Sequence, residues 1–293
     1  MESVIVLGAY GLLGESLCAC LTERGYVVAR QGRREGANLR CDPRDVSALA
    51  RAIREINPSA IVNLIAATNV DACEEDPRSA YTANVAPLEA LEAAIQGLDW
   101  AVHPHIVHVS TDQLYDGPGL HVEHVHAPVN VYALSKLAGE FVAERLGATT
   151  LRTNFFGRSR SADRQSLSDW VVSSIRRGDR ITVFDDVFFS AWHINTLCGV
   201  IGDAIALRAP GVFNAGSTNG MSKADFAIEL ARVLNLDIGT MGIGKSTAAR
   251  FKARRPLDMR MDVSLFERTF RTVAPTMLSQ IYITASEYEN DQS

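Results

Sequence analysis

Short apolar runs alternate with longer amphipathic stretches along the first half of the chain. The apolar runs are typical of strands buried on both faces and lie at residues 3–8, 26–30, 60–66 and 105–110. Apolar positions at helical spacing follow at residues 11–25, 44–57 and 84–97, and then in a helix that begins near Tyr132. This alternation predicts right-handed βαβ units in a doubly wound α/β fold, a parallel sheet with helices on both sides.

The regular alternation of apolar and amphipathic stretches becomes less clear after about residue 155. A strand is predicted at 149–154, and further strands at 180–184 and 211–216. Helices are predicted at residues 166–178, 195–207 and 222–235. We therefore predict a sheet domain over residues 1–155, and a mixed segment over 156–293 that partly completes the sheet and forms a smaller substrate-binding subdomain. The final residues, 287–293, are predicted to be frayed.

Composition and charge narrow the classes of partner. The 293 residues carry 29 basic and 34 acidic side chains, a net charge of -5, which argues against a nucleic-acid or anionic-membrane partner. The N-terminus has no basic region typical of a signal peptide, and no apolar run is long enough to span a bilayer. Five scattered cysteines predict neither a disulfide framework nor a zinc site, so a reducing cytoplasm is expected.

A glycine-rich turn follows the first predicted strand. In "GAYGLLG", Gly8, Gly11 and Gly14 lie between that strand and the helix after it. Glycines are needed there for a tight turn, for close approach to a pyrophosphate and for packing of helix on strand. The helix N-terminus offers unpaired N–H groups to phosphates. The turn therefore predicts a dinucleotide site, which includes Tyr10, Leu12 and Leu13, over the alternative of a turn without ligand.

The residues after the second strand indicate which dinucleotide is bound. The segment "RQGRRE" supplies Arg30, Arg33 and Arg34 and no acid before Glu35, whereas NAD sites place an acid there. Guanidinium groups suit a 2′-phosphate, so NADPH is predicted and NADH is possible; a solvated basic loop is the alternative. Asp42 either accepts from the adenine amino group or caps the following helix.

A second cluster of polar residues follows the fourth predicted strand. Ser110 and Thr111 lie at its carboxyl end, where doubly wound sheets place ligands. Tyr132 and Lys136 are four residues apart, so they share one helical face and can both point toward those hydroxyls. The alternative for this pair is a half-buried tyrosine beside a surface lysine.

This set matches the needs of ketone reduction by hydride, which requires a proton for the developing alkoxide. Free tyrosine, with a pKa of about 10, is a slow donor near neutrality. A nearby ammonium and a positively charged nicotinamide ring are expected to lower the pKa of Tyr132. Lys136 can also hold the cofactor ribose, and Thr111 can bond the substrate carbonyl.

The combined motifs resemble a known family. The segments "GAYGLLG", "STDQLYDG", "YALSKLAGE", "LRTNFFG" and "RRPLDMRMD" together resemble the extended short-chain dehydrogenase/reductases, and within them the dTDP-4-dehydrorhamnose reductase branch of sugar-nucleotide-binding proteins. The resemblance implies a Rossmann domain, a smaller C-terminal substrate domain and NADPH-dependent reduction of a 4-keto nucleotide sugar. It also implies a homodimer that forms through the Tyr132 helix and its neighbour.

The same resemblance implies roles for single residues. Thr111, Tyr132 and Lys136 would be catalytic. Asn84 would order the cofactor site, which Ala66 and Ala67 would line.

On the substrate side, the resemblance makes Arg255 a candidate for the substrate diphosphate. Asn154 and Trp192 would contact sugar or base, with core packing as an even alternative. Gln113 departs from the family, which more often has an aromatic residue there. Related dehydratases carry an Asp-Glu pair after the threonine, so the sequence "TDQ" disfavours dehydration.

Two further patterns are expected to be misleading. The segment "GTMGIGKS" at 239–246 matches the phosphate-binding P-loop pattern, yet a helix ends just before it and Pro256 cuts short the segment after it. Lys245 is therefore expected to be a loop charge. The histidines cluster at residues 103–108 and 121–126 without Cys or paired carboxylates, so a structural role is predicted for them and no metal site.

Three functions remain open at this point. The first is the 4-keto sugar-nucleotide reductase. The second is a binding or regulatory module, because the branch also resembles the regulatory β subunit of methionine adenosyltransferase. The third is a nucleotide-sugar epimerase, which the arginines after the second strand disfavour.

Overall fold

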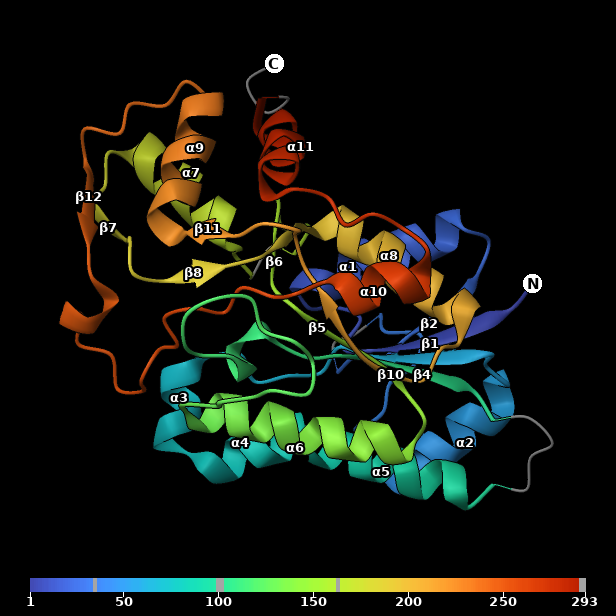
Figure 1. Cartoon of the computed structure of the whole chain (residues 1–293). Helices are drawn as coiled ribbons and strands as arrows, with labels where there is room; N and C mark the ends of the chain where they lie inside the picture. Colours follow the sequence, from blue (N-terminus) through green and yellow to red (C-terminus); the bar gives the residue numbers. More distant parts are fainter. Residues whose placement is uncertain (34–35, 99–102, 162–163, 290–293) are drawn as a thin grey trace.

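The computed structural model describes residues 1–33, 36–98, 103–161 and 164–289 (Figure 1). At its centre lies a six-stranded parallel sheet in the order β10-β5-β4-β3-β1-β2. Its strands are β1 (Ser3–Leu7), β2 (Val27–Arg30), β3 (Ala60–Asn63), β4 (His105–Val109), β5 (Thr149–Thr153) and β10 (Gly211–Ala215). The predicted doubly wound α/β fold is confirmed.

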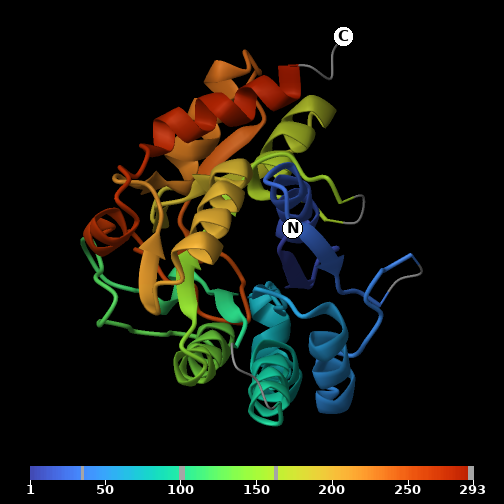
Figure 2. The ribbon, with the colours of Figure 1, turned by 90° about the vertical axis from the view of Figure 1, so that its right-hand side faces the viewer.

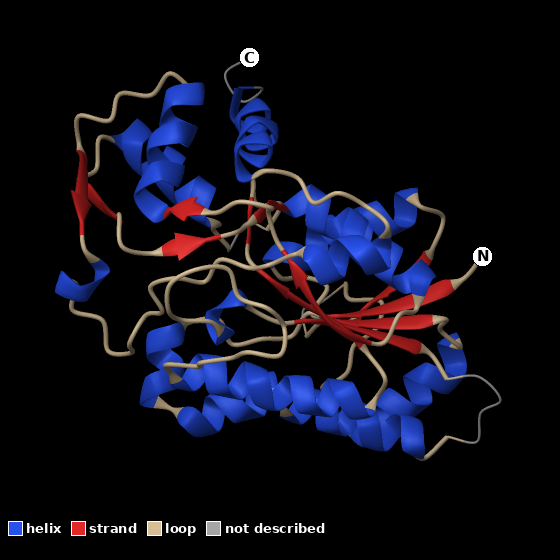
Figure 3. Cartoon of the chain, viewed as in Figure 1, coloured by secondary structure: helices blue, strands red, loops and turns tan. Residues whose placement is uncertain are grey.

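Helices cover both faces of the sheet (Figures 1 and 3). One face carries α1 (Leu12–Glu23), α8 (Ile194–Leu207) and α10 (Ser264–Phe270). The other carries α2 (Val46–Ile56), α3 (Val70–Glu75), α4 (Pro77–Asn84), α5 (Ala86–Gln96) and α6 (Val131–Arg145). Side-chain caps begin several of these helices; for example, Asp45 accepts from the Ala48 N–H in α2 and Asn130 from the Ala133 N–H in α6.

The structure differs from the predictions in two places. The helix predicted over residues 84–97 corresponds to α5, which begins two residues later at Ala86, whereas the short helices α3 and α4 before it were not predicted. The strand near residues 26–30 lies at the sheet edge, where Val27 is half exposed, so it is not buried on both faces.

The second half of the chain contributes to both lobes. Its helix α8 and strand β10 belong to the large sheet layer, whereas α7 (Leu167–Arg177), α9 (Lys223–Val233) and α11 (Met277–Glu289) form a smaller lobe (Figures 1 and 2). Three two-stranded sheets accompany these elements: β6 (Phe155–Phe156) with β9 (Trp192–His193), β7 (Ile181–Phe184) with β12 (Met241–Gly244), and β8 (Phe188–Phe189) with β11 (Met221–Ser222). This lobe has its own apolar core around Phe189 and Phe226.

The C-terminal segment is ordered further than predicted. Residues 287–289 continue α11, and the Tyr288 ring is buried while its hydroxyl donates to Asp169 Oδ1 at 2.6 Å. Burial of the ring and this hydrogen bond hold the end of the helix. The remaining residues of the predicted frayed tail, 290–293, lie outside the described residues.

A buried ion pair joins α6 to the sheet. Arg152 in β5 and Glu140 in α6 are each 3% exposed, and Arg152 Nη2 lies 2.7 Å from Glu140 Oε2. The Arg152 guanidinium also donates to the Tyr115 hydroxyl at 2.8 Å and to the Glu123 carbonyl at 2.7 Å. The charge is therefore paired and hydrogen-bonded, as a buried guanidinium requires.

No helix among the described residues is both long enough and apolar enough to cross a bilayer.

Candidate active site

The glycine turn between β1 and α1 leaves room for a ligand. Gly8 has φ +80°, in the left-handed region, and Gly11 is the N-cap of α1 without a side-chain hydrogen bond. The first N–H groups of α1 therefore face outward unpaired by a cap. A Cβ at Gly14 would lie 2.5 Å from the Gly8 carbonyl oxygen, so the close packing of helix on turn requires glycine there.

Two adjoining cavities follow the carboxyl ends of the strands. One, of about 440 Å³, includes Gly8, Tyr10, Gly11, Arg33, Asp42 and Ala66 in its lining. The other, of about 360 Å³, includes Gly8, Gly11, Leu12, Leu13, Gly14, Ala66, Thr111, Tyr132, Lys136 and Asn154. The two cavities meet at the glycine turn, so together they offer an extended groove with the turn at its middle.

The residues predicted to select the cofactor are only partly available to it. Arg33 lines the first cavity, and Arg34 lies outside the described residues. Arg30, by contrast, pairs with Glu15 and lies over the Tyr10 ring, 4.7 Å from its centroid. Arg33 is thus the described arginine of this segment that faces the cavity.

Asp42 also lines the first cavity, where it is held by Arg44 at 2.6 Å. The side-chain hydrogen bond from Arg44 lowers the pKa of Asp42 to about 2. The alternative that Asp42 caps the following helix is wrong, because Asp45 is the N-cap of α2. The physical reason is position: Asp45 directly precedes the first helical residue, Val46.

Asn84 orders the wall of the groove and does not line either cavity. Its Oδ1 accepts from the Ala67 N–H at 2.7 Å, and its Nδ2 donates to the Ser135 hydroxyl at 2.7 Å. Ala66, next to Ala67, lines both cavities. Asn84 therefore links the loop after β3 to helix α6.

Thr111, Tyr132 and Lys136 come together in the second cavity. All three are buried, and Lys136 Nζ donates to the Val109 carbonyl at 2.8 Å. Burial raises the pKa of Tyr132 to about 12, an effect that the Thr111 hydroxyl partly offsets. Burial lowers the pKa of Lys136 to about 8, against the attraction of Glu140.

The predicted lowering of the Tyr132 pKa is therefore wrong for the protein alone. The cause is burial of the phenol, which disfavours phenolate, while the ammonium of Lys136 is directed to the Val109 carbonyl. A raised pKa keeps the phenol protonated at neutral pH, which is the form that a proton donor needs.

Asp112 is a site residue that the sequence reasoning missed. It is 1% exposed, and its Oδ2 accepts from Asn154 Nδ2 at 2.8 Å while its Oδ1 accepts from the Thr111 hydroxyl at 3.4 Å. Burial raises the pKa of Asp112 to about 6. An acid directly after two hydroxyls at a strand end was the available signal, but its hydrogen-bond partner Asn154 lies far along the chain.

The stability of an Asp112→Asn variant relative to the parent is expected to increase as pH rises. The pKa of Asp112 is about 6 in the folded protein and 3.8 for an ordinary aspartate, so the proton on Asp112 contributes stability below pH 4 that is lost as pH rises through 6. Asp112→Asn avoids this loss. The difference in free energy of unfolding between the variant and the parent should therefore shift in favour of the variant by about 2 to 3 kcal/mol from pH 4 to pH 7. Urea unfolding at both pH values measures the difference.

An exposed carboxyl gives a control of opposite sign for that measurement. Hydrogen bonds from Ser79 lower the pKa of Asp76, so Asp76→Asn should lose stability relative to the parent as pH rises. A stability difference between Asp112→Asn and the parent that stays constant from pH 4 to pH 7 would contradict the raised pKa.

A third cavity, of about 260 Å³, lies on the far side of Asn154 from the glycine turn. Its lining includes Gln113, Asn154, Trp170, Phe184, Lys223, Phe251 and Arg255. Arg255 is 21% exposed, pairs with Asp71 at 3.0 Å and lies over the Phe251 ring. The cavity thus combines aromatic walls with two cationic side chains, those of Arg255 and Lys223.

Trp192 is not a site residue, and its predicted contact with sugar or base is wrong. It is 0% exposed and packs against Phe266 with ring centroids 5.2 Å apart. Its position in β9, beneath helix α8 and inside the main core, places the indole away from the three cavities. The alternative of core packing therefore holds.

The segment at 239–246 does not have the structure of a phosphate-binding P-loop. Strand β12 ends at Gly244 and is followed by one 3-10 turn, Ser246–Ala248, in place of a full helix. Lys245 pairs with Asp185 at 2.8 Å on the surface. Among the described residues, no group of three or more His, Cys, Asp and Glu side chains is arranged to hold a metal ion.

Comparison with known proteins gives a consistent result. The family model described as "RmlD substrate binding domain" matches residues 1–289. A probable low-salt glycan biosynthesis reductase of Haloferax volcanii is 25% identical over 97% of the chain and 99% of that protein. The dTDP-4-dehydrorhamnose reductase of Escherichia coli K12 is 26% identical over 97% of the chain and 99% of that protein.

A solved structure has the same fold over nearly the whole chain. The dTDP-4-dehydrorhamnose reductase of Bacillus anthracis, determined in complex with NADP, superposes with a TM-score of 0.87 at 23% identity. The match covers 98% of this chain and 99% of that one.

Proposed function

Because the chain belongs to the RmlD substrate binding domain family, we propose that it is an oxidoreductase that reduces the 4-keto group of a nucleotide sugar with NADPH. The observation that carries the proposal is the meeting of Thr111, Tyr132 and Lys136 in a cavity that adjoins the glycine turn. Full-length similarity to proteins named as reductases supports the same reaction.

The residues of the groove fit a dinucleotide phosphate. The uncapped N-terminus of α1 offers N–H groups to a diphosphate, and Gly14 allows this helix to pack closely on the turn. Arg33 supplies a cation for a 2′-phosphate beside Asp42. We assign cofactor binding to residues 1–155 with β10 and α8, and substrate binding mainly to the rest of 156–293.

The catalytic residues divide the work of ketone reduction. When bound, NADPH supplies the hydride for the carbonyl carbon. The Tyr132 hydroxyl donates its proton to the carbonyl oxygen, which becomes the alcohol, and Lys136 stabilises the phenolate that remains. The Thr111 hydroxyl, which contacts Asp112, is placed to donate a hydrogen bond to the same oxygen.

The third cavity is the place proposed for the nucleotide sugar. Asn154 lines both this cavity and the catalytic one, so a sugar there would reach Tyr132 while the nucleotide extends between the lobes. Arg255 suits the diphosphate through its planar fork, and the aromatic side chains suit a base. Gln113 lines both cavities with an amide, so the Asp-Glu pair that dehydration uses is incomplete.

Oxidation of NADPH with dTDP-4-dehydrorhamnose generated in situ tests the proposal. Turnover that depends on the keto sugar, with slower turnover on NADH, is the expected result. Tight binding of NADPH without turnover across a panel of 4-keto nucleotide sugars would reject the reductase and leave the binding or regulatory module. Interconversion of sugars without net consumption of NADPH would indicate an epimerase.

We further propose a homodimer that forms through α6. Leu134 and Phe141 are about half exposed, and their spacing of two turns places them on one face of α6, a helix that lies beside α4 and α5 (Figure 1). In this arrangement Phe141→Glu should convert a dimer to a monomer, measured by light scattering after size exclusion. A parent chain that is monomeric at the same concentration would overturn the proposal.

A further inference from the structure

A loop from the second half of the chain lines the groove together with the glycine turn. Its described residues, 157–161 and 164–166, connect β6 to α7. Arg164 of this loop lines both the first and the second cavity, together with Gly8 and Gly11 of the turn. The loop and the turn therefore both line the place where the two cavities meet.

Arg164 differs in charge from the other residues at this junction. The side chains common to both cavities are otherwise glycine or apolar, from Gly8, Gly11, Leu64 and Ala66. Within the described part of the chain, no hydrogen bond or ion pair of the Arg164 guanidinium is present, and the residue is exposed. By contrast Arg177, on the adjacent helix α7, is held by Asp179 at 2.8 Å.

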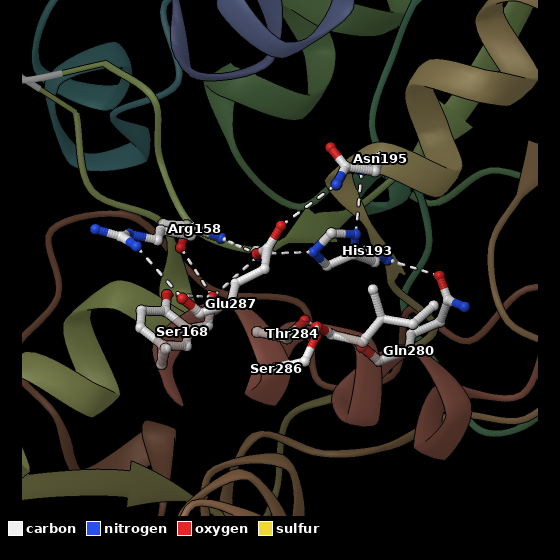
Figure 4. Close-up of polar contacts among 12 residues, drawn as sticks. Arg158, Ser168, His193, Asn195, Gln280, Thr284, Ser286 and Glu287 are labelled. Atoms are coloured by element: carbon white, nitrogen blue, oxygen red, sulfur yellow. Dashed lines mark hydrogen bonds and ion pairs between the residues drawn. The ribbon is translucent and has the colours of Figure 1, made fainter. Parts of the chain in front are cut away.

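The loop is anchored where it leaves β6. Glu287 of α11 accepts from the Arg158 N–H at 3.0 Å and from His193 Nε2 at 3.0 Å (Figure 4). His193 Nδ1 accepts from the Asn195 N–H, so its Nε2 carries the hydrogen that it donates to Glu287. Burial raises the pKa of Glu287, but these hydrogen bonds and the nearby charge of Arg160 outweigh it and lower that pKa, so Glu287 accepts as a carboxylate.

The loop is also anchored where it enters α7. Asp169 Oδ2 accepts from the Ser159 N–H at 3.1 Å and from the Ser166 N–H at 2.9 Å, so one carboxylate joins both ends. Tyr288 of α11 donates to the other oxygen of Asp169 at 2.6 Å. The C-terminal helix α11 thus holds both ends of the loop that carries Arg164.

We propose that Arg164 binds the diphosphate of the dinucleotide from the side opposite the α1 N-terminus, and that Glu287 is a positioning residue for the Arg164 loop. This inference rests on the proposed cofactor. The α1 N–H groups and a guanidinium then approach a diphosphate from two sides, which suits its two negatively charged groups. The contact of Arg164 is available to NADPH and NADH equally, because both contain the diphosphate. Arg33, by contrast, binds only the 2′-phosphate, which NADH lacks.

Fluorescence titration of the full chain with NADPH and with NADH tests whether Arg164 binds the diphosphate and Arg33 the 2′-phosphate. Arg164→Gln should raise both dissociation constants by the same factor, about 10- to 100-fold for loss of a charge-assisted hydrogen bond. Arg33→Gln should raise the constant for NADPH only, and Arg177→Gln should change neither. ADP-ribose, which has the diphosphate, should lose affinity for Arg164→Gln, whereas adenosine 2′-monophosphate should not.

Several outcomes would overturn the assignment. Unchanged dissociation constants in Arg164→Gln would exclude a contact with either coenzyme, and a loss confined to NADPH would move Arg164 to the 2′-phosphate. Failure of the parent chain to bind NADPH at all would reject the proposed function itself. That result is distinct from one in which the parent binds NADPH and Arg164→Gln binds it equally well.

A double-mutant cycle tests the role of Glu287. Glu287→Ala should raise the dissociation constant for NADPH about 3- to 10-fold in the parent, by releasing the loop, and should have no effect on affinity when Arg164 is already glutamine. Equal effects in both backgrounds would show that Glu287 acts on the fold in general and not through Arg164. Thermal unfolding of each variant confirms that folded protein is compared.

Discussion

The Tyr132→Phe variant should reduce a 4-keto nucleotide sugar about 10²- to 10⁴-fold more slowly than the parent chain and bind NADPH equally well. The substitution removes the proton that the carbonyl oxygen receives and keeps the ring that is buried in the cavity. The raised pKa of Tyr132 means that the parent side chain is the protonated donor throughout the neutral range. Steady-state NADPH oxidation gives kcat, and fluorescence titration gives the dissociation constant.

A tyrosine outside the site provides the matched control. Tyr81 in α4 is 46% exposed and donates its hydroxyl to Glu89, so Tyr81→Phe should leave both kcat and NADPH binding unchanged. If Tyr132→Phe retained a kcat within threefold of the parent value, Tyr132 would not be the proton donor.

Arg152→Met should lower the free energy of unfolding by about 3 to 5 kcal/mol. The change leaves the carboxylate of Glu140 buried without its partner, and it removes the donor to the Tyr115 hydroxyl and the Glu123 carbonyl. Each buried group that loses its hydrogen bond adds to the cost. Urea unfolding followed by circular dichroism measures the change.

The chain offers both a surface control and a compensating change for this pair. Arg145 pairs with Glu92 at 2.7 Å but is 54% exposed, so Arg145→Met should cost less than about 1 kcal/mol. Adding Glu140→Leu to Arg152→Met should recover part of the loss, because no charge then remains buried without a partner. Equal unfolding free energies for Arg152→Met and Arg145→Met would contradict the importance of burial.

The sheet strands and the shared helical face of Tyr132 and Lys136 were predictable because their signals are local. Apolar runs such as residues 60–66 indicate buried strands directly, and Tyr132 with Lys136 shares a helical face by spacing alone. The glycine turn combines a strand, a helix and three glycines within a few residues. Each of these features is decided by neighbours in the sequence.

The rest of the site depends on contacts between distant segments. Asp112 accepts a hydrogen bond from Asn154, and the loop that carries Arg164 is hydrogen-bonded to Glu287 of α11. Tryptophan is a residue type that often contacts ligands, and only the packing of Trp192 against Phe266 shows that it belongs to the core. Local patterns carry no information on such pairings.

The order of segments along the chain has a consequence for protein synthesis. The sheet edge at β5 is covered by β10, and α1 is covered by α8, so the first lobe needs residues 194–215 from the second half. At typical elongation rates the ribosome needs about 3 to 12 seconds to pass from residue 155 to residue 215. During that interval the outer edge of β5 has no strand beside it, and such an edge can pair with other chains.

Ribosome pausing within this interval should therefore favour aggregation of the nascent chain, and fragments that terminate before β10 should need chaperones to stay in solution. Codon usage between residues 155 and 215 is thus a determinant of yield that the folded protein does not reveal.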